Sequence, residues 1–112
     1  MNELHTKNGL VHLDLKPDNV VMMDDFCLGL IDFGHSNSIH GQLRNVVGTD
    51  KYMAPEVLNL KQRKSKSSYN PEKVDIFSLG VILFSLLLGT MPFWSADKED
   101  SYYKFIIDGN FE

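Results

Sequence analysis

The stretch HLDLKPDN, residues 12–19, places several chemically active groups between apolar residues. Asp14 could accept a proton, and Lys16, two residues later, supplies a cation. Asn19, five residues after Asp14, offers a neutral amide oxygen, and hard oxygen ligands of this kind suit Mg²⁺. A base, a cation and a metal ligand therefore fall within one short segment.

A second acidic group follows in the stretch IDFG, where twelve residues separate Asp32 from Asn19. Residues 20–23 and 27–31 are short apolar runs on either side of a polar break, which is typical of two strands joined by a tight turn. Such a hairpin would return Asp32 to the neighbourhood of Asn19, where the two side chains could share a metal ion. Phosphoryl transfer needs a base, a cation beside the transferred group, and metal ions that neutralise phosphate oxygens.

The flanking segments indicate how these groups are positioned. Residues 1–8, with Gly9 as a left-handed cap, are typical of the last turns of a helix. Residues 34–52 become polar without periodicity and predict a long loop, and loops of that length are usually functional or disordered. A short helix is expected over residues 55–60, with Pro55 in its first turn.

Two more helices are predicted further along the chain. The strongest candidate covers residues 74–88, and because its apolar residues cover every face, it should be surrounded on all sides. The rest of the chain offers few elements to cover it, which suggests missing neighbours. Residues 98–108 carry an apolar stripe of their own. Residues 61–73 have five basic residues to one acidic and predict a solvated loop, with docking of an acidic partner as the alternative.

Composition narrows the class of protein. With 112 residues, of which 43% are hydrophobic, the chain is long enough for one domain at most. Its formal net charge of −4 argues against general nucleic-acid binding. A single cysteine and the lack of a secretory leader predict an intracellular, cytoplasmic protein. The longest apolar run, residues 81–89, is shorter than the roughly 20 residues that span a bilayer, so no membrane span is expected.

Either charged motif alone would be weak evidence, because an Asp-Lys-Asp cluster in a loop is usually surface charge. Order and spacing together are more specific: HLDLKPDN, a hairpin-length gap, DFG, a loop, GTDKYMAPE, and then VDIFSLG opening an apolar helix. In this order the chain resembles the eukaryotic protein kinase family, serine/threonine type. The resemblance implies an α+β, mainly α fold, namely the larger, C-terminal lobe of a kinase with a small β-hairpin, and an incomplete one.

The resemblance also implies how much of a kinase domain the chain contains and which residues would carry out its reaction. Residues 1–112 would be a partial kinase domain, from the catalytic loop to the start of the helix that follows the APE motif and the long apolar helix, without an N-lobe. Asp14 resembles the catalytic base, and Lys16 the lysine that touches the γ-phosphate of ATP. Asn19 and Asp32 resemble the two Mg²⁺ ligands. ATP and a protein substrate are the expected partners, and the oligomeric state is left open.

Five more residues match positions that support the family's site. His12 and Phe33 resemble the packed pair that links the catalytic loop to DFG. Asp75 resembles the helix aspartate that accepts backbone N–H bonds from the catalytic loop, and it could also cap its helix. Thr49 resembles the loop threonine that bonds near Asp14 and Lys16. Glu56 resembles the APE glutamate, whose usual arginine partner lies outside these 112 residues.

Some features depart from the family pattern. Leu13 stands where an arginine is usual, so pairing with a phosphorylated activation loop is not expected. The chain contains no glycine-rich loop, no strand lysine for the α- and β-phosphates, no glutamate to pair with that lysine, and no hinge. The isolated 112 residues are therefore expected to be inactive or weakly active. A non-catalytic, kinase-like binding module is the alternative function.

Overall fold

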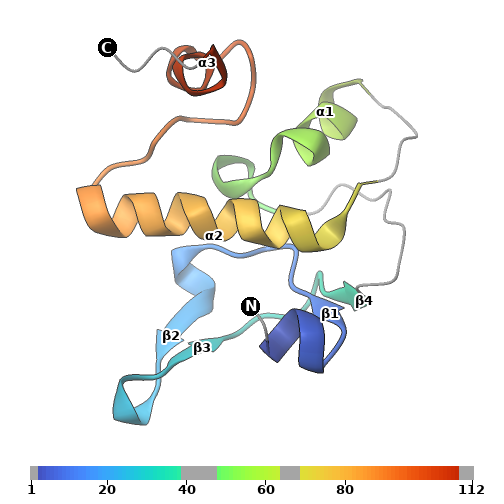
Figure 1. Cartoon of the computed structure of the whole chain (residues 1–112), viewed down its shortest axis with the longest axis vertical. Coiled ribbons are helices and arrows are strands. Elements are labelled where there is room, and N and C mark those ends of the chain that lie inside the picture. Colours follow the sequence, from blue (N-terminus) through green and yellow to red (C-terminus); the bar gives the residue numbers. More distant parts are fainter. Residues whose placement is uncertain (1–2, 39–47, 64–68, 109–112) are drawn as a thin grey trace.

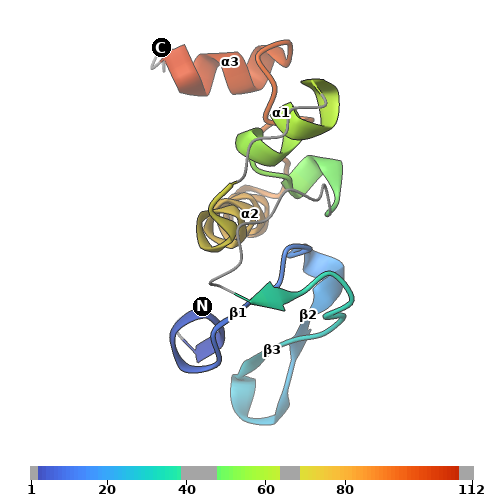
Figure 2. The same cartoon turned by 90° about the vertical axis from the view of Figure 1, so that its right-hand side faces the viewer.

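The computed structural model describes residues 3–38, 48–63 and 69–108. Helix α2 (Pro71–Leu88) runs through the middle of the molecule. The strands and the N-terminal helical turn lie on one side of α2, while α1 (Pro55–Arg63) and α3 (Ser101–Asp108) lie on the other (Figures 1 and 2). Helices combined with small antiparallel sheets agree with the expected mainly α class.

The predicted hairpin is confirmed. Strands β2 (Val20–Met22) and β3 (Leu28–Leu30) pair antiparallel, with Val20 opposite Leu30 and Met22 opposite Leu28. A 3-10 turn over Asp24–Phe26 joins them. Because the pairing brings the end of β3 back to the start of β2, the segment that carries DFG begins beside the segment that carries Asn19.

A second strand pair was not predicted. Strand β1 (Leu10–Val11) pairs antiparallel with β4 (Asn37–Ser38), and β4 lies inside the segment predicted to be a long loop. The same segment ends in a 3-10 turn over Asp50–Tyr52, and residues 39–47 lie outside the described part. Two-residue strands have no readable period, so only the partner strand identifies them.

The N-terminal segment and the first helix differ in detail from the prediction. Glu3–Lys7 forms a helical turn of π type, and Gly9 follows with φ of 62°, the left-handed conformation expected for a cap. Helix α1 continues to Arg63, past the predicted end at residue 60. The solvated loop predicted for residues 61–73 is thus partly helical, and its residues 64–68 lie outside the described part.

Helix α2 begins three residues earlier than predicted. Asn70 is its N-cap, with the side-chain oxygen accepting a hydrogen bond from the Lys73 N–H at 3.1 Å, and Pro71 occupies the first turn. The helix ends at Leu88, where Gly89 has φ of 70° and supplies the left-handed cap. The capping role considered for Asp75 is therefore wrong, because Asn70 takes that position.

The core joins β1, α1 and α2. Val11, Leu13 and Val74 are almost fully buried and pack with the apolar face of α1. A smaller cluster of Val81, Phe93 and Ala96 lies between α2 and the segment before α3. The first cluster consists of Val11, Leu13, Met53, Ala54, Val57, Leu58, Leu60, Tyr69 and Val74.

The described residues do not surround α2 as its sequence predicts. Leu86 and Leu87 are each 73% exposed, and Ile76, Leu83 and Leu88 are more than half exposed. A bare apolar stripe of this kind usually marks a contact surface. In the described residues, no helix combines the length and apolar character needed to cross a membrane.

Helix α3 starts at Ser101, three residues later than predicted, because Asp100 caps it. Asp100 Oδ1 accepts hydrogen bonds from the N–H groups of Tyr102 and Tyr103 at 3.0 and 3.1 Å. Its Oδ2 accepts from Trp94 at 2.8 Å and Ser95 at 3.1 Å. Burial opposes the charge, but these four bonds together outweigh it and lower the pKa of Asp100 below its ordinary value.

Acid is therefore expected to loosen the junction between α3 and the Trp94 segment. Because the pKa is lower in the folded chain, the unfolded chain binds the proton more readily, so the stabilisation is complete above the unfolded pKa and lost as pH falls through the folded pKa. Amide hydrogen exchange at Trp94 and Tyr103, followed from about pH 5 to about pH 2, measures this loss. Asp100→Asn, which cannot titrate, should lack the transition. Equal protection of the unsubstituted chain at both ends of the range would contradict the prediction.

Candidate active site

The segment that carries Asp14 is anchored to α2 through Asp75. Asp75 is completely buried, and its Oδ2 accepts the His12 N–H at 2.7 Å while its Oδ1 accepts the Leu13 N–H at 2.8 Å. Hydrogen bonds to a buried carboxylate are stronger than those between neutral groups. Burial, and then the charge of Asp75, also raise the pKa of the nearby Tyr69 hydroxyl. The two N–H bonds fix the backbone immediately before Asp14.

A third donor to Asp75 was missed by the sequence analysis. Buried His5 donates from Nε2 to Asp75 Oδ2 at 2.9 Å, and its Nδ1 lies 3.7 Å from Glu72 Oε1. Seventy positions separate His5 from Asp75, and a lone histidine in a helical turn carries no local sign of such a contact. His5 therefore acts on the site through Asp75.

Leu13 holds a backbone conformation that is unusual for a leucine. Its φ is 68°, in the left-handed region, which costs roughly 1–2 kcal/mol for a residue with a Cβ. The bond from its N–H to Asp75 and the burial of its side chain offset this cost. Gly48 packs against the same point with φ of 113°, and a Cβ there would lie 2.8 Å from the Leu13 carbonyl oxygen. Glycine is therefore needed at position 48.

The Asp14 side chain has two neighbours that the sequence analysis named. Thr49 Oγ1 donates to Asp14 Oδ1 at 2.9 Å, and Lys16 Nζ lies 4.0 Å from Asp14 Oδ2. Asp14 is 8% exposed, while Lys16 is partly exposed. One carboxylate oxygen is thus oriented by a hydroxyl and the other faces a cation at the surface.

His12 links the Asp14 backbone to the segment before DFG. Its Nδ1 accepts the Asp14 N–H at 3.1 Å, so the proton belongs on Nε2, which donates to the Ile31 carbonyl at 2.8 Å. The ring of His12 lies 5.0 Å from that of Phe33, at 59° to it. His12 is fully buried and uses both nitrogens within the protein, as a packed core histidine does.

Asn19 is held between the Asp14 loop and the hairpin. Its Nδ2 donates to the Asp14 carbonyl at 2.8 Å, and its own carbonyl accepts the Ile31 N–H at 2.9 Å. Asn19 is only 5% exposed. Since Nδ2 is engaged by a carbonyl, Oδ1 is the atom of this amide that is left for a ligand.

The two chain neighbours of Asp32 contact the residues described above: Ile31 bonds to Asn19 and His12, and Phe33 packs against His12. The φ of Asp32 is 60°, and its exposed side chain turns back on its own loop, where Oδ1 accepts the Gly34 N–H at 3.3 Å. Lys16 and Asn19 thus each contact Asp14, Lys16 through its side-chain oxygen and Asn19 through its carbonyl. Asp32 is connected to them only through the backbone of Ile31, which bonds to Asn19. Convergence of the Asn19 and Asp32 side chains on one metal ion stays a prediction.

Helix α2 also holds the segment that carries Thr49. Ser78 Oγ donates to the Tyr52 carbonyl at 2.6 Å, one turn after Asp75 on the same helix. Half-buried Glu56 lies close enough to Tyr103 for its charge, after burial, to raise the pKa of that tyrosine. A single helix therefore positions both the Asp14 loop and the Thr49 segment.

The chain is similar to known proteins over nearly its whole length. A family model described as the protein kinase domain matches residues 1–111. The chain is 38% identical over 114 residues to the phosphorylase b kinase gamma catalytic chain, liver/testis isoform, of Rattus norvegicus, with 100% of this chain and 27% of that protein covered.

Two other relatives are named as kinases. The chain is 41% identical over 95 residues to the serine/threonine-protein kinase cds1 of Schizosaccharomyces pombe, covering 82% of this chain and 20% of that protein. It is 44% identical over 89 residues to the SNF1-related protein kinase catalytic subunit alpha KIN12 of Arabidopsis thaliana, covering 78% of this chain and 17% of that protein. The chain thus spans about a quarter or less of the length of these relatives.

Proposed function

This chain belongs to the protein kinase family, and from that we propose that residues 1–112 form the part of a serine/threonine kinase's C-terminal lobe that holds the catalytic loop and the metal ligands. The full-length protein transfers the γ-phosphoryl group of ATP to a serine or threonine hydroxyl of a substrate protein. The observation that carries the proposal is the fixed Asp14 carboxylate, oriented by Thr49 Oγ1 and faced by Lys16 Nζ.

Asp14 acts as the base in this proposal. Its carboxylate takes the proton of the acceptor hydroxyl as the hydroxyl oxygen bonds to the γ-phosphorus, while the bond from that phosphorus to the β-phosphate oxygen breaks and ADP leaves. Thr49 fixes which oxygen of Asp14 faces the acceptor. Lys16, whose ammonium is partly exposed beside Asp14, is placed to meet negative charge on the transferred group.

The donor set suits Mg²⁺. Mg²⁺ in phosphoryl-transfer sites is held by one or two protein oxygen ligands together with substrate phosphates and water. Asn19 Oδ1 and the exposed carboxylate of Asp32 are oxygen donors of the required kind, and the β2–β3 hairpin joins the Asn19 carbonyl to the N–H of Ile31, the residue before Asp32. A bound Mg²⁺ would neutralise phosphate oxygens, and these two residues are the ones proposed to hold it.

Three observations support serine or threonine as the acceptor rather than tyrosine. Lys16 lies two residues after the base, as the resemblance to serine/threonine kinases requires. Thr49 makes the bond to Asp14 that the resemblance implies. One relative, the cds1 kinase of Schizosaccharomyces pombe, is itself named a serine/threonine-protein kinase.

The metal proposal can be tested on the 112-residue chain without an activity assay. Mn²⁺, which accepts the same oxygen ligands, should broaden the NMR signals of Asn19 and Gly34 when ATP is present. Asp32→Asn is expected to weaken this binding by about tenfold or more, because loss of a direct ligand should cost at least as much as loss of a supporting contact.

The matched control is Asp24→Asn, which removes the same charge from an exposed position at the tip of the hairpin. It should leave the Mn²⁺ titration unchanged. Equal binding by Asp32→Asn and the unsubstituted chain would remove Asp32 from the metal site. Phosphoryl transfer by the full-length product of the gene to serine, threonine and tyrosine peptides then tests the reaction itself.

A further inference from the structure

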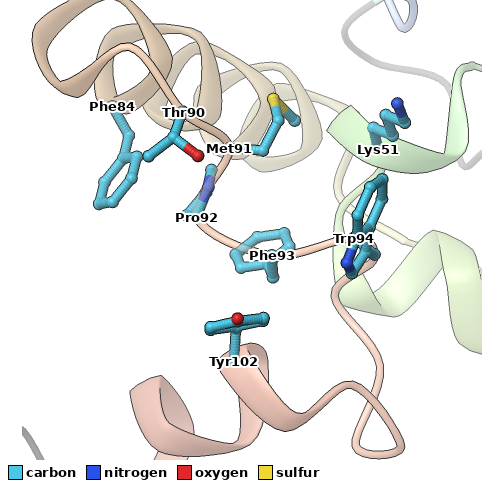
Figure 3. A pocket seen from close by; sticks show the side chains of 8 residues that line it. All are labelled: Lys51, Phe84, Thr90, Met91, Pro92, Phe93, Trp94 and Tyr102. Carbon is cyan, nitrogen blue, oxygen red and sulfur yellow. The ribbon is translucent and has the colours of Figure 1, made fainter.

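A pocket lies next to the segment that carries Thr49, which contributes Lys51 to its lining. It is an open pocket of about 520 Å³ between the end of α2, the segment that follows, and the first turn of α3. Figure 3 shows Lys51 and Trp94 on one side of it, Phe84 and Thr90 on the other, and Tyr102 rising from α3. The lining residues are Lys51, Phe84, Thr90, Met91, Pro92, Phe93, Trp94 and Tyr102.

The side chains that line the pocket are mostly apolar, and one of them, Lys51, is charged. Four aromatic rings face the pocket, and aromatic rings favour other rings and bulky apolar groups by edge-to-face contact. Lys51 Nζ lies 5.3 Å from the centroid of the Trp94 ring, a cation–π contact. Among the residues that the structure describes, no carboxylate forms an ion pair with Lys51. The pocket therefore offers an apolar surface and an unneutralised cation.

The walls of the pocket are held in place before anything binds. Phe93 is buried, and its ring lies 6.1 Å from Phe77 and 5.2 Å from Tyr103. Asp100 holds the backbone N–H of Trp94, and the Ser85 hydroxyl lies 3.1 Å from Met91 Sδ. A preformed surface loses little freedom on binding, which favours affinity.

The place of the pocket connects it to the proposed reaction. Lys51 follows two residues after Thr49, whose hydroxyl contacts Asp14. Two residues of chain span at most about 7 Å, so a polypeptide with its hydroxyl at Asp14 can reach the pocket within a few residues. A substrate protein can therefore occupy both sites at once.

The exposure of the pocket and the charge at its rim indicate what kind of ligand it binds. Trp94 is 68% exposed and Tyr102 is 61% exposed, so the pocket is too open to enclose a small molecule, which usually buries most of its surface. An open aromatic surface suits one large side chain of a polypeptide. The cation of Lys51 at the rim adds a preference for a carboxylate next to that side chain.

We propose that this pocket, defined by Lys51, Phe84, Trp94 and Tyr102, binds a protein substrate through a bulky apolar side chain flanked by an acidic residue. The proposal rests on the proposed kinase function, because the pocket adds a substrate preference to that site. Binding at the pocket requires no phosphoryl transfer, however. Its success or failure can therefore be measured apart from catalysis.

Trp94 is the one tryptophan of the sequence, so its fluorescence reports on the pocket directly. The 112-residue chain is titrated with three blocked peptides: Gly-Phe-Asp-Gly, Gly-Phe-Asn-Gly and Gly-Ala-Asp-Gly. Gly-Phe-Asp-Gly should bind tightest. Loss of the phenyl group should weaken binding by about tenfold or more, because a buried phenylalanine side chain is the main contact. Loss of the charge should weaken it roughly threefold, as for an exposed ion pair.

Three variants assign the contacts. Lys51→Glu should abolish the preference for aspartate over asparagine, and exposed Tyr102→Ala should weaken both phenylalanine peptides. Lys73→Glu, the same charge change at an exposed position of α2, is the control and should keep the preference. In the full-length kinase, Lys51→Glu should raise KM for a serine peptide carrying Phe-Asp and leave kcat unchanged.

Two results would overturn the proposal. One is an equal fluorescence response to all three peptides. The other is a change in Trp94 emission with protein concentration alone, which would mean that a second copy of the chain covers this face. Failure of phosphoryl transfer with the peptide preference intact would count against the kinase function and not against the pocket.

Discussion

Replacing Asp14 with asparagine is expected to lower the turnover number of the full-length kinase by about 10²- to 10⁴-fold, the usual contribution of a positioned general base. Asparagine keeps the shape of the side chain, and its amide oxygen can still accept the hydrogen bond from Thr49 Oγ1. It cannot take the proton of the acceptor hydroxyl. Steady-state kinetics should therefore show the loss in kcat, with KM for ATP and thermal stability little changed.

Thr49→Val gives a graded comparison for Asp14→Asn. It removes the hydroxyl that orients Asp14 Oδ1 while leaving the carboxylate in place. Its effect on kcat should be about tenfold, smaller than the loss of the base itself. If Asp14→Asn kept kcat within a factor of about ten, Asp14 would not be the base. That result would favour the alternative function, a non-catalytic kinase-like binding module.

Replacing Asp75 with alanine should have the largest effect on stability. The change leaves three donors without their acceptor in a fully buried place: the N–H groups of His12 and Leu13, and Nε2 of His5. Removing one partner from such a buried charged contact typically costs about 3–5 kcal/mol. That is a large fraction of the total stability of a small domain, roughly 5–15 kcal/mol. Urea unfolding of the chain measures the loss.

Two further variants separate the role of Asp75 from general disturbance of α2. Asp75→Asn keeps the volume but places an NH₂ group against a backbone donor, so it should also destabilise the chain, by about 1–3 kcal/mol. Glu72→Gln changes a half-exposed residue 3.7 Å from the same His5 and should cost less than about 1 kcal/mol. Equal unfolding midpoints for Asp75→Ala and Glu72→Gln would contradict the anchoring role.

Asp14 and Asp75 lie at different distances from the proposed phosphoryl transfer, but helix α2 positions both. Asp75 holds the backbone before Asp14, and Ser78, one turn further along α2, holds the Tyr52 carbonyl after Thr49. The carboxylate of Asp14 and the hydroxyl that orients it are therefore positioned from the same support. A site built on a regular helix is held more rigidly than one built on loops alone.

The chemical groups of the site and the local elements could be predicted from the amino-acid sequence. The order and spacing of HLDLKPDN, DFG and GTDKYMAPE predicted the kinase family, which the family model confirms. The apolar runs around residues 24–26 predicted the β2–β3 hairpin, and Gly9, predicted to be a left-handed cap, has the positive φ of one. These features depend on residues close together in the chain, so a local pattern is sufficient to predict them.

The contacts between distant segments became visible only in the folded chain. The pairing of β1 with β4, the contact of His5 with Asp75 and the stacking of Lys51 on Trp94 each join segments that share no local pattern. Because α2 starts at Pro71, Asp75 lies inside the helix and not at its cap, and its carboxylate accepts the backbone N–H groups that precede Asp14. Such contacts depend on packing in three dimensions, because burial leaves each buried donor needing an acceptor wherever in the chain that acceptor lies.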